Sequence, residues 1–204
     1  VGTMPVPAGT VRAVPLGRPR CLAAGERARC RSAHRRAGVS SSRGFTVSQA
    51  VLGVIGGSGL YDLPGLEDGE ERRVATPWGE PSDALRFGRI GDTRIVFLPR
   101  HGRGHRIPPG EIDHRANVDA LKRAGVTDLV SFSACGSFRE ELPPGRFVLV
   151  DQFVDRTHGR AGSFFGRGCV AHVSLAHPVG PALQDLIARA AAAEGIDFHR
   201  GGTA

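Results

Sequence analysis

The residues best suited to chemistry form a cationic corner, Arg100-His101, after a short apolar run from Thr93 to Leu98. The β-branched and aromatic residues of that run predict a buried strand, and Pro99 ends it because proline has no N–H for the sheet. An arginine guanidinium can donate two parallel hydrogen bonds to phosphate, and each charge-assisted bond is worth about 1.5–3 kcal/mol. Ligands of α/β sheets usually lie at the carboxyl ends of strands. The corner therefore predicts an anion site, with a solvated basic loop as the alternative.

Two loops of small residues follow other predicted strands. Residues Gly56–Leu60 come directly after the apolar run Val51–Ile55, and residues Ser133–Ser137 come after Asp128–Phe132. A glycine-rich turn at a strand end can bring backbone N–H groups, and here the Ser58 hydroxyl, close to a phosphate. We expect the three loops to converge into one anion pocket at one edge of a sheet. Ordinary tight turns are the alternative interpretation of each loop by itself.

The glycine loop matches neither of two common nucleotide motifs. It lacks the Lys-Ser/Thr pair of a P-loop, and Asp62 stands where the dinucleotide pattern G-x-G-x-x-G needs its last glycine or an alanine. Elsewhere the sequence shows no carboxylate pair, no metal-ligand cluster and no nucleophile beside a base. We therefore expect neither a metal nor a cofactor.

Strands interleaved with helices predict an α/β fold. A Gly91-Asp92 turn between two apolar runs is typical of a β-hairpin, since glycine fits the first position of a type II′ turn. Pro181 at the first helical position and Gly195 after the last give the clearest helix. We interpret residues 61–82 as a surface connection and residues 157–168 as a loop whose two phenylalanines pack on a neighbouring subunit. The expected strands are 51–55, 84–90, 93–98, 128–132, 146–154 and 196–200, and the expected helices are 111–123 and 181–194.

The first 49 residues differ in composition from the rest of the chain. They contain nine arginines and one acidic residue, Glu26, so that residues 1–49 carry a balance of +8 while the other 155 residues sum to −1. This Arg-rich extension is expected to be disordered. It could be a transit peptide, a basic interaction arm, or extra coding sequence before a domain that begins near Gln49, and we favour the last. The basic charge lies outside the body of the protein, so we expect no nucleic-acid partner.

The spacing of the four cysteines predicts that they are reduced thiols. Cys21, Cys30, Cys135 and Cys169 show no C-x-x-C spacing, so neither a zinc site nor a disulfide framework is expected. No apolar run is long enough to span a bilayer or to serve as a secretory signal. We expect a cytoplasmic protein with no membrane partner.

Together these motifs resemble the methylthioadenosine phosphorylase branch of the purine nucleoside phosphorylase family. The resemblance extends from about residue 51 to the end of the chain, and the order and number of the motifs make it specific. The matching segments are Ile55-Gly56-Gly57-Ser58-Gly59-Leu60, Thr76-Pro77, Pro81-Ser82-Asp83-Ala84, Arg100-His101-Gly102 with His105 and Pro108, Ala116-Asn117, Ser133-Ala134-Cys135-Gly136-Ser137 with Arg139-Glu140-Glu141, and Asp151-Gln152-Phe153-Val154-Asp155-Arg156-Thr157.

The resemblance implies a phosphorylase-type three-layer fold, with a central mixed β-sheet flanked by helices, and a homotrimer. Residues 50–204 would form part of a domain that cleaves the N-glycosidic bond of a purine nucleoside with inorganic phosphate as co-substrate. The nucleoside would be 5′-methylthioadenosine, with a 6-oxopurine nucleoside, or phosphate binding without turnover, as alternatives. His172 would reach the sugar pocket of a neighbouring subunit. Transferred by motif, the phosphate ligands are Ser58, Arg100, His101, Ser133 and the backbone of Ala134.

Two departures from the family pattern bear on activity. Asp113-His114 stands where the family usually has Asn-Tyr. The family's Gly-Pro-Arg-Phe segment, its purine-reading acids and its sugar-contacting methionine would come after Ala204. No residue is therefore assigned to protonate the base, and we expect the fold to be incomplete at its C-terminus and the 204-residue chain to be a poor catalyst by itself. Rival families are a histidine phosphatase, with His101 as nucleophile, and a dinucleotide-binding module.

Overall fold

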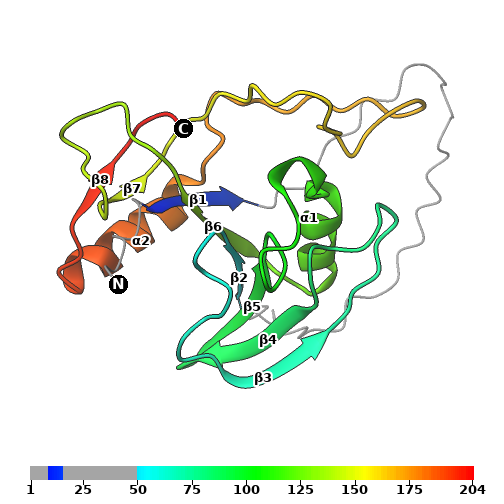
Figure 1. The fold of residues 1–204 in the computed structure, drawn as a ribbon, viewed down its shortest axis with the longest axis horizontal. Helices are drawn as coiled ribbons and strands as arrows, with labels where there is room; N and C mark the ends of the chain where they lie inside the picture. Colours follow the sequence, from blue (N-terminus) through cyan, green and yellow to red (C-terminus); the bar gives the residue numbers. More distant parts are fainter. Residues whose placement is uncertain (1–8, 16–49) are drawn as a thin grey trace, which may run out of the picture.

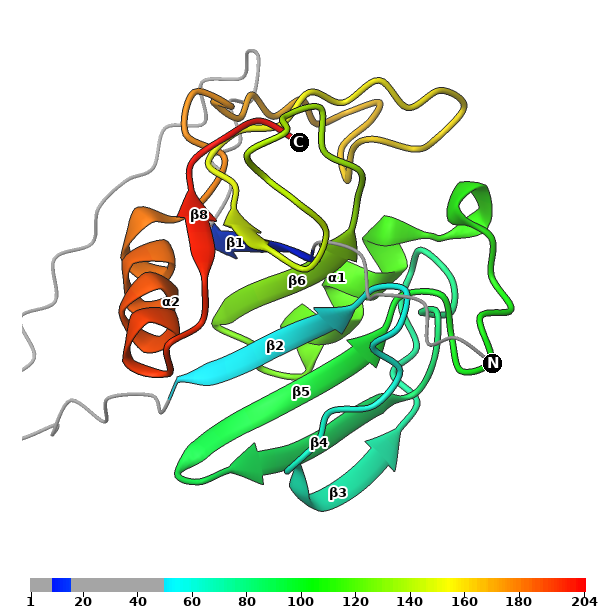
Figure 2. The ribbon, with the colours of Figure 1, turned by 60° about the vertical axis from the view of Figure 1, so that its left-hand side comes forward.

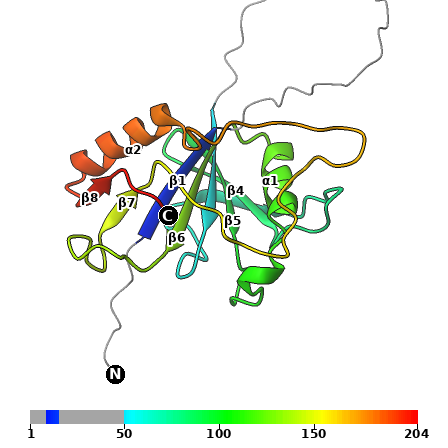
Figure 3. The same cartoon turned by 90° about the horizontal axis from the view of Figure 1, so that it is seen from above.

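The computed structural model describes residues 9–15 and 50–204, which form a mixed sheet with a helix on each face (Figure 1). The eight strands lie in the order β3-β4-β5-β2-β6-β1-β7-β8. Helix α1 (His114–Arg123) packs on one face of the sheet and helix α2 (Pro181–Ala193) on the other, as Figure 3 shows from above. This three-layer α/β arrangement confirms the fold class expected from the sequence.

Three parallel strands at the centre of the sheet place the candidate loops together, at the carboxyl ends of these strands. β2 (Val51–Gly56) lies between β5 (Thr93–Pro99) and β6 (Asp128–Ala134), and all three run in the same direction (Figure 2). The side chains of β2 and β5 alternate between a core under α1 and a second core on the opposite face. Near-continuous apolar runs are typical of strands buried on both faces, which is why the sequence predicts these three strands well.

A β-hairpin delivers the Arg-His corner. β4 (Leu85–Ile90) pairs antiparallel with β5, and Gly91 takes a φ of +55° in the turn between them, which confirms the predicted hairpin. β3 (Glu67–Arg72) adds an edge strand next to β4. The interpretation of residues 61–82 as a surface connection misses β3, because its exposed and mostly charged residues show no apolar alternation.

Helix α1 begins later than its apolar spacing predicts. A 3-10 turn (Pro109–Glu111) comes first, and Asp113 then acts as the helix N-cap. The Asp113 carboxylate accepts hydrogen bonds from the backbone N–H groups of Arg115 and Ala116, at 2.9 and 3.0 Å. An N-cap side chain satisfies N–H groups that the first helical turn leaves open, so it fixes where the helix starts. The first helical residue is consequently His114.

The last third of the chain adds two short strands and the longer helix. β7 (Phe147–Leu149) pairs in parallel with β8 (Phe198–Arg200), and α2 packs against both. β7 is shorter than the predicted strand 146–154, because the backbone beyond Leu149 makes only irregular hydrogen bonds with residues 202–204. Residues 150–180, called the connector below, join β7 to α2 without a helix or strand.

β1 (Gly9–Pro15) lies between β6 and β7, antiparallel to β6 and parallel to β7. The prediction that residues 1–49 are disordered is therefore wrong for these seven residues. Their backbone groups pair with two strands that would otherwise present open edges, an effect that a composition argument does not take into account. The rest of the predicted extension, with Cys21 and Cys30, lies outside the described residues.

The described part of the chain holds neither a membrane span nor a metal cluster. None of its helices is both long enough and apolar enough to cross a bilayer. Within residues 9–15 and 50–204, no group of His, Cys, Asp and Glu side chains could hold a metal ion. Cys135 and Cys169 form no disulfide in this part of the chain.

Candidate functional site

The five residues predicted as phosphate ligands line one cavity of about 870 Å³ at the carboxyl ends of the central strands. Ser58 follows β2, Arg100 and His101 follow β5, and Ser133 and Ala134 end β6. Because the three strands are parallel neighbours, their carboxyl ends meet at the same edge and bring the loops together. The loops therefore converge as expected, while the role of each residue as a phosphate ligand stays a prediction.

Two glycines let the loop after β2 lie against its neighbours. A Cβ atom on Gly56 would sit 2.2 Å from the carbonyl oxygen of Leu60, and one on Gly57 would sit 2.5 Å from the carbonyl oxygen of Phe132. No real Cβ atom approaches an oxygen so closely, so this loop needs residues without a side chain. The backbone N–H of Arg100 donates to the Gly56 carbonyl at 2.8 Å, which ties the second loop to the first.

The Arg100 guanidinium is held against the third loop. Its Nη1 donates a 2.7 Å hydrogen bond to the Ser133 Oγ. A serine hydroxyl that accepts one bond keeps its own proton to donate, so Ser133 can bind Arg100 and an anion at the same time. The Arg100 side chain thus joins the loops after β5 and β6 and fixes a positive charge in the cavity. A charge fixed before the ligand arrives is what an oxyanion site needs.

His101 is buried, with 4% of its surface exposed. Its Nδ1 lies 2.9 Å from the carbonyl oxygen of Ile107, and since a carbonyl only accepts, we assign the proton to Nδ1. The ring stacks on His105 with centroids 4.3 Å apart, and the His105 Nδ1 lies 2.8 Å from the Tyr61 hydroxyl. In a neutral ring the Nε2 of His101 is then an acceptor, suited to a protonated phosphate oxygen.

A buried carboxylate, Asp83, supports the Arg-His corner. Its Oδ2 accepts a 2.8 Å hydrogen bond from the backbone N–H of Arg103, and its Oδ1 lies 3.8 Å from the Arg106 Nη2. Burial by itself raises the pKa of Asp83, but the backbone N–H groups of Arg103 and Ala84 and the two arginine charges together hold it below its usual value. Asp83 is therefore ionised at neutral pH and anchors the corner.

Ser82 and Asn117 tie helix α1 to the same corner. The Ser82 N–H donates to the Asn117 Oδ1 at 2.8 Å, and the Asn117 Nδ2 donates to the Ser82 Oγ at 2.9 Å. Both residues are buried, so this pair of bonds is shielded from water. Gly102 has a φ of +68°, and a Cβ there would lie 3.0 Å from the Ser82 carbonyl oxygen. The corner therefore packs too closely on this pair for any other residue to replace Gly102 without strain.

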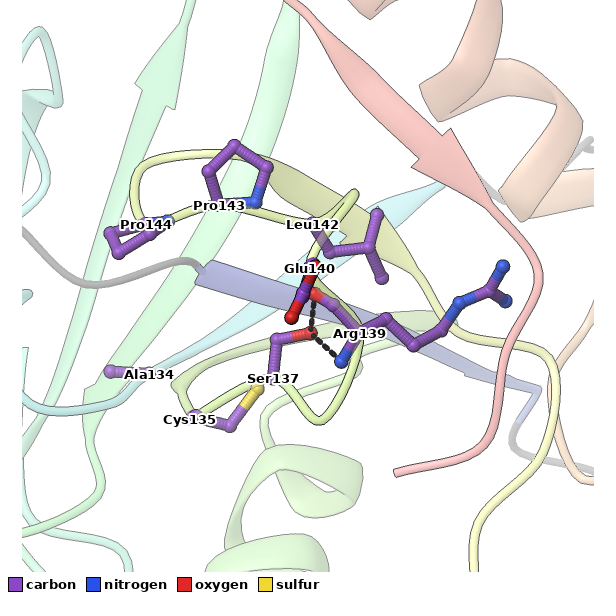
Figure 4. A pocket seen from close by; sticks show the side chains of 9 residues that line it. Ala134, Cys135, Ser137, Arg139, Glu140, Leu142, Pro143 and Pro144 are labelled. Carbon is purple, nitrogen blue, oxygen red and sulfur yellow. Dashed lines mark hydrogen bonds between the residues drawn. The ribbon is translucent and has the colours of Figure 1, made fainter.

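The loop after β6 continues into a second hollow of about 670 Å³, which Figure 4 shows from close by. Ala134 lines this hollow and the first cavity. Within it, the Ser137 Oγ accepts from the Arg139 N–H and donates to the Arg139 carbonyl, both at 3.0 Å. The Arg139 Nε also donates to Glu141 at 2.6 Å. This pairing neutralises the arginine of the second hollow, so the first cavity is the better candidate for an anion.

The first cavity also contains charged side chains that the motifs do not assign. In the sequence, His114 stands out only as a departure from the family pattern, and His105, Asp155 and Arg156 lie in segments that match the family without a role assigned to them. His172 is exposed and does not line this cavity, so its role toward a neighbouring subunit stays a prediction. The unassigned charged or titratable side chains are His105, His114, Arg115, Asp155, Arg156 and Arg160.

Comparison with known proteins decides the family. A model of the Phosphorylase superfamily matches residues 51–204. The chain belongs to the phosphorylase superfamily. The S-methyl-5′-thioadenosine phosphorylase of Bradyrhizobium diazoefficiens is 68% identical over 157 residues, which are 77% of this chain and 54% of that protein. The protein of the same name from Cereibacter sphaeroides is 61% identical over 155 residues, with coverages of 76% and 53%. The chain thus spans about half the length of the curated relatives it matches.

Solved structures in the family share the fold. The methylthioadenosine phosphorylase from Schistosoma mansoni in complex with adenine is 38% identical, with a TM-score of 0.73 over 76% of this chain and 61% of that chain. A mutant of the adenosine/methylthioadenosine phosphorylase from the same organism, in complex with methylthioadenosine, has a TM-score of 0.72 at 36% identity, with coverages of 76% and 62%. These matches confirm the family resemblance and leave the histidine phosphatase and dinucleotide-binding readings without support.

Proposed function

We propose that the protein forms the phosphate-binding part of an enzyme that cleaves 5′-methylthioadenosine with phosphate. The products would be adenine and 5-methylthioribose 1-phosphate, a purine salvage reaction. The observation that carries this proposal is the Arg100–Ser133 bond, which sets a guanidinium beside a hydroxyl where three loops meet. The nucleoside is inferred from the relatives, which are named S-methyl-5′-thioadenosine phosphorylases.

Phosphate would lie between the three loops, with a donor or acceptor from each. Arg100 and the hydroxyls of Ser58 and Ser133 would donate to its oxygens, and the Ala134 N–H would add a backbone donor. The His101 Nε2 would accept a hydrogen bond from the protonated oxygen, because its Nδ1 already donates to the protein. Holding phosphate in one orientation lowers the entropic cost of its attack on the sugar.

Phosphorolysis then exchanges one bond at the sugar. As the bond between C1′ and the purine nitrogen breaks, its electron pair leaves with the base and the sugar gains oxocarbenium character. A phosphate oxygen forms the new bond to C1′ from the opposite face, and the departing purine takes up a proton. The anion that Arg100 holds in place stabilises the cationic sugar, so the described residues contribute mainly by electrostatic preorganisation.

We further propose a cytoplasmic homotrimer that uses inorganic phosphate as co-substrate and needs no cofactor or metal. The support for subunit contact lies in the connector, where Val154, Val170, Val173 and Leu175 are exposed. Apolar side chains gathered on one segment favour burial against a partner. His172 belongs to the same stretch and would reach the sugar pocket of the neighbouring subunit.

Base release from the purified chain tests the reaction. We expect 5′-methylthioadenosine to yield adenine only when phosphate is present, and faster than inosine yields hypoxanthine. Arg100→Ala should abolish the effect of phosphate, whereas Arg189→Ala, on an exposed position of α2, should not. Adenine release without phosphate would indicate hydrolysis and contradict the proposal. Faster release from inosine would contradict the choice of nucleoside.

A second candidate is a chain that holds phosphate without turning over a nucleoside. It is favoured by the first cavity, whose five predicted ligands are all suited to binding an anion. Phosphate binding without base release from either nucleoside would establish this second candidate in place of the first.

A further inference from the structure

His114 lines the cavity, and the proposed phosphate contacts do not use it. It is the first residue of α1, directly after the N-cap Asp113, and it shares the cavity wall with Arg100 and Arg160. The residue is partly exposed and partly buried in the cavity wall, so that a ligand in the cavity can reach it. Among the described residues, none forms a hydrogen bond with the His114 ring. The imidazole is thus available to a ligand.

Charges from three elements act on this imidazole. Partial burial in the cavity wall lowers the pKa of His114 most, followed by the positive charges of Arg160 in the connector and Arg100 after β5. The carboxylates of Asp113 and Asp155 act in the opposite direction but more weakly, so the pKa lies below its ordinary value of 6.5. The empty cavity therefore holds a neutral His114 ring at pH 7.

The neighbouring side chains of the cavity differ from His114 in their hydrogen-bond partners or in their fixed charge. The two other histidines already bind the Ile107 carbonyl and the Tyr61 hydroxyl, and arginines keep their charge at any pH near neutral. Asp155 accepts hydrogen bonds from the Thr157 backbone N–H and hydroxyl, which hold its pKa below the usual value. The other titratable or charged side chains that line the cavity with His114 are Arg100, His101, His105, Arg115, Asp155, Arg156 and Arg160.

A bound oxyanion would shift the protonation equilibrium of the His114 ring toward the imidazolium form. Its negative charge would offset Arg100 and Arg160, which in the empty cavity disfavour an imidazolium, and it would offer a protonated ring a charged hydrogen-bond acceptor. We propose that His114 is an anion-contacting residue that takes up a proton from solvent when a dianionic oxyanion fills the cavity. This inference rests on the proposed phosphate site and adds a proton-linked contact to it.

Coupling between anion binding and protonation of His114 makes the anion affinity depend on pH. Well below the pKa of His114 in the empty site, the ring is protonated with or without the anion, and well above its pKa in the complex it is neutral in both states. Between these two values, binding requires a proton, so affinity falls as the pH rises. The fall reaches about tenfold per pH unit where a full proton is taken up.

Sulfate is the appropriate probe, because it stays dianionic where phosphate itself titrates. Calorimetry at neutral pH in two buffers of different ionisation enthalpy gives the number of protons taken up on binding. We expect uptake of up to one proton by the wild-type chain, and an affinity that falls as the pH rises through neutrality. His114→Gln should bind sulfate more weakly, with proton uptake near zero and a flat pH profile.

The matched control is His177→Gln, which removes an exposed connector histidine outside the cavity and should behave as the wild type. Proton uptake by His114→Gln equal to that of the wild type would overturn the proposal. Sulfate binding by the wild type without any uptake would overturn it too, while leaving the anion site intact. Failure of the wild type to bind sulfate or phosphate would contradict the proposed phosphate site itself, and the inference with it.

Discussion

The three loops of the cavity and the connector differ in how their conformations are fixed. The loops are joined to one another by long-range contacts, since Arg100 bonds to both Gly56 and Ser133. The connector is joined to residues 202–204 near its start, at residues 151–154, while farther along the chain its hydrogen bonds include local ones, as between Thr157 and Asp155. The cavity loops are therefore determined by the fold of the sheet, whereas the middle of the connector, residues 155–174, is not paired with a strand.

The connector exposes several large apolar side chains, whereas the histidine of the Arg-His corner is buried. In the connector, Val173 and Leu175 are 72% and 63% exposed, while His101 in the cavity loops is 4% exposed. Phe164 of the connector packs edge-on against Trp78, with ring centroids 5.4 Å apart. Phe164, which we expected to contact a neighbouring subunit, thus has an intramolecular contact as well. Substitutions should disturb anion binding far more in the cavity loops than in the connector.

The largest effect is expected for Arg100→Ala. This change removes the guanidinium that joins two loops and carries the fixed positive charge. Phosphate affinity should fall by about a hundredfold or more, since charge-assisted bonds are worth about 1.5–3 kcal/mol each. Calorimetric titration with phosphate measures the loss, and Arg189→Ala is the control with the same change in net charge. Equal affinity of Arg100→Ala and wild type would show that the anion lies elsewhere.

Gly57→Ala should have the next largest effect. The added Cβ would lie 2.5 Å from the Phe132 carbonyl oxygen and 3.1 Å from the Arg100 Nη2, so the loop must move away from both. We expect a loss of about 1–3 kcal/mol in the free energy of unfolding, as for other overpacked sites, together with weaker phosphate binding. Gly166→Ala, in the connector and outside the cavity, meets nothing within 4 Å and serves as the control. Similar denaturant midpoints for the two variants would contradict the close approach of the loops.

Asp83→Asn should weaken the support of the corner while leaving every cavity residue in place. The loss of one buried charge beside Arg103 and Arg106 should cost about 1.5–3 kcal/mol of stability at neutral pH. Because the folded-state pKa of Asp83 is lowered, its contribution is present above the unfolded pKa of about 3.9 and is lost as the pH falls through the folded value.

Denaturant unfolding of Asp83→Asn and wild type between neutral and acid pH measures this contribution. The two stability curves should approach one another below about pH 4. Asp92→Asn, in the exposed turn of the hairpin, is the control. A stability difference that stays constant down to acid pH would exclude an ionised Asp83 as the anchor.

The smallest effect is expected for Leu175→Ser in the connector. Its side chain is largely exposed and lies outside the cavity, so phosphate affinity should stay within about twofold of the wild type. The same calorimetric titration provides the measurement. A loss comparable to that of Arg100→Ala would mean that the connector, and not the sheet edge, organises the anion site.

The sequence predicts the parts of this site that depend on local patterns. Apolar runs mark β2, β5 and β6, and small or cationic residues directly after them mark the loops that meet at the sheet edge. The Arg100–Ser133 pairing follows once the three strands are parallel neighbours. These features are predictable because each strand has its own apolar run, and the parallel arrangement of the three strands then brings their loops together.

Features that depend on distant partners were not predictable. β3 is recognised only by its pairing with β4, and β1 only by its place between β6 and β7. The supporting role of Asp83 could not be predicted, because its partner Arg103 lies 20 positions away in the sequence and is brought close only by the fold. The place of His114 in the cavity depends on where helix α1 starts, which the Asp113 cap decides rather than the apolar spacing.

Phosphate titration of the ¹⁵N-labelled chain, followed at the backbone amides, tests most directly whether three loops form one anion site. We predict that the amide signals of Ser58, Arg100 and Ala134 shift together and fit a single dissociation constant, while exposed connector amides such as that of Leu175 stay unchanged. Shifts confined to one loop, different constants for the three loops, or shifts only in the connector would contradict a single site at the edge of the sheet.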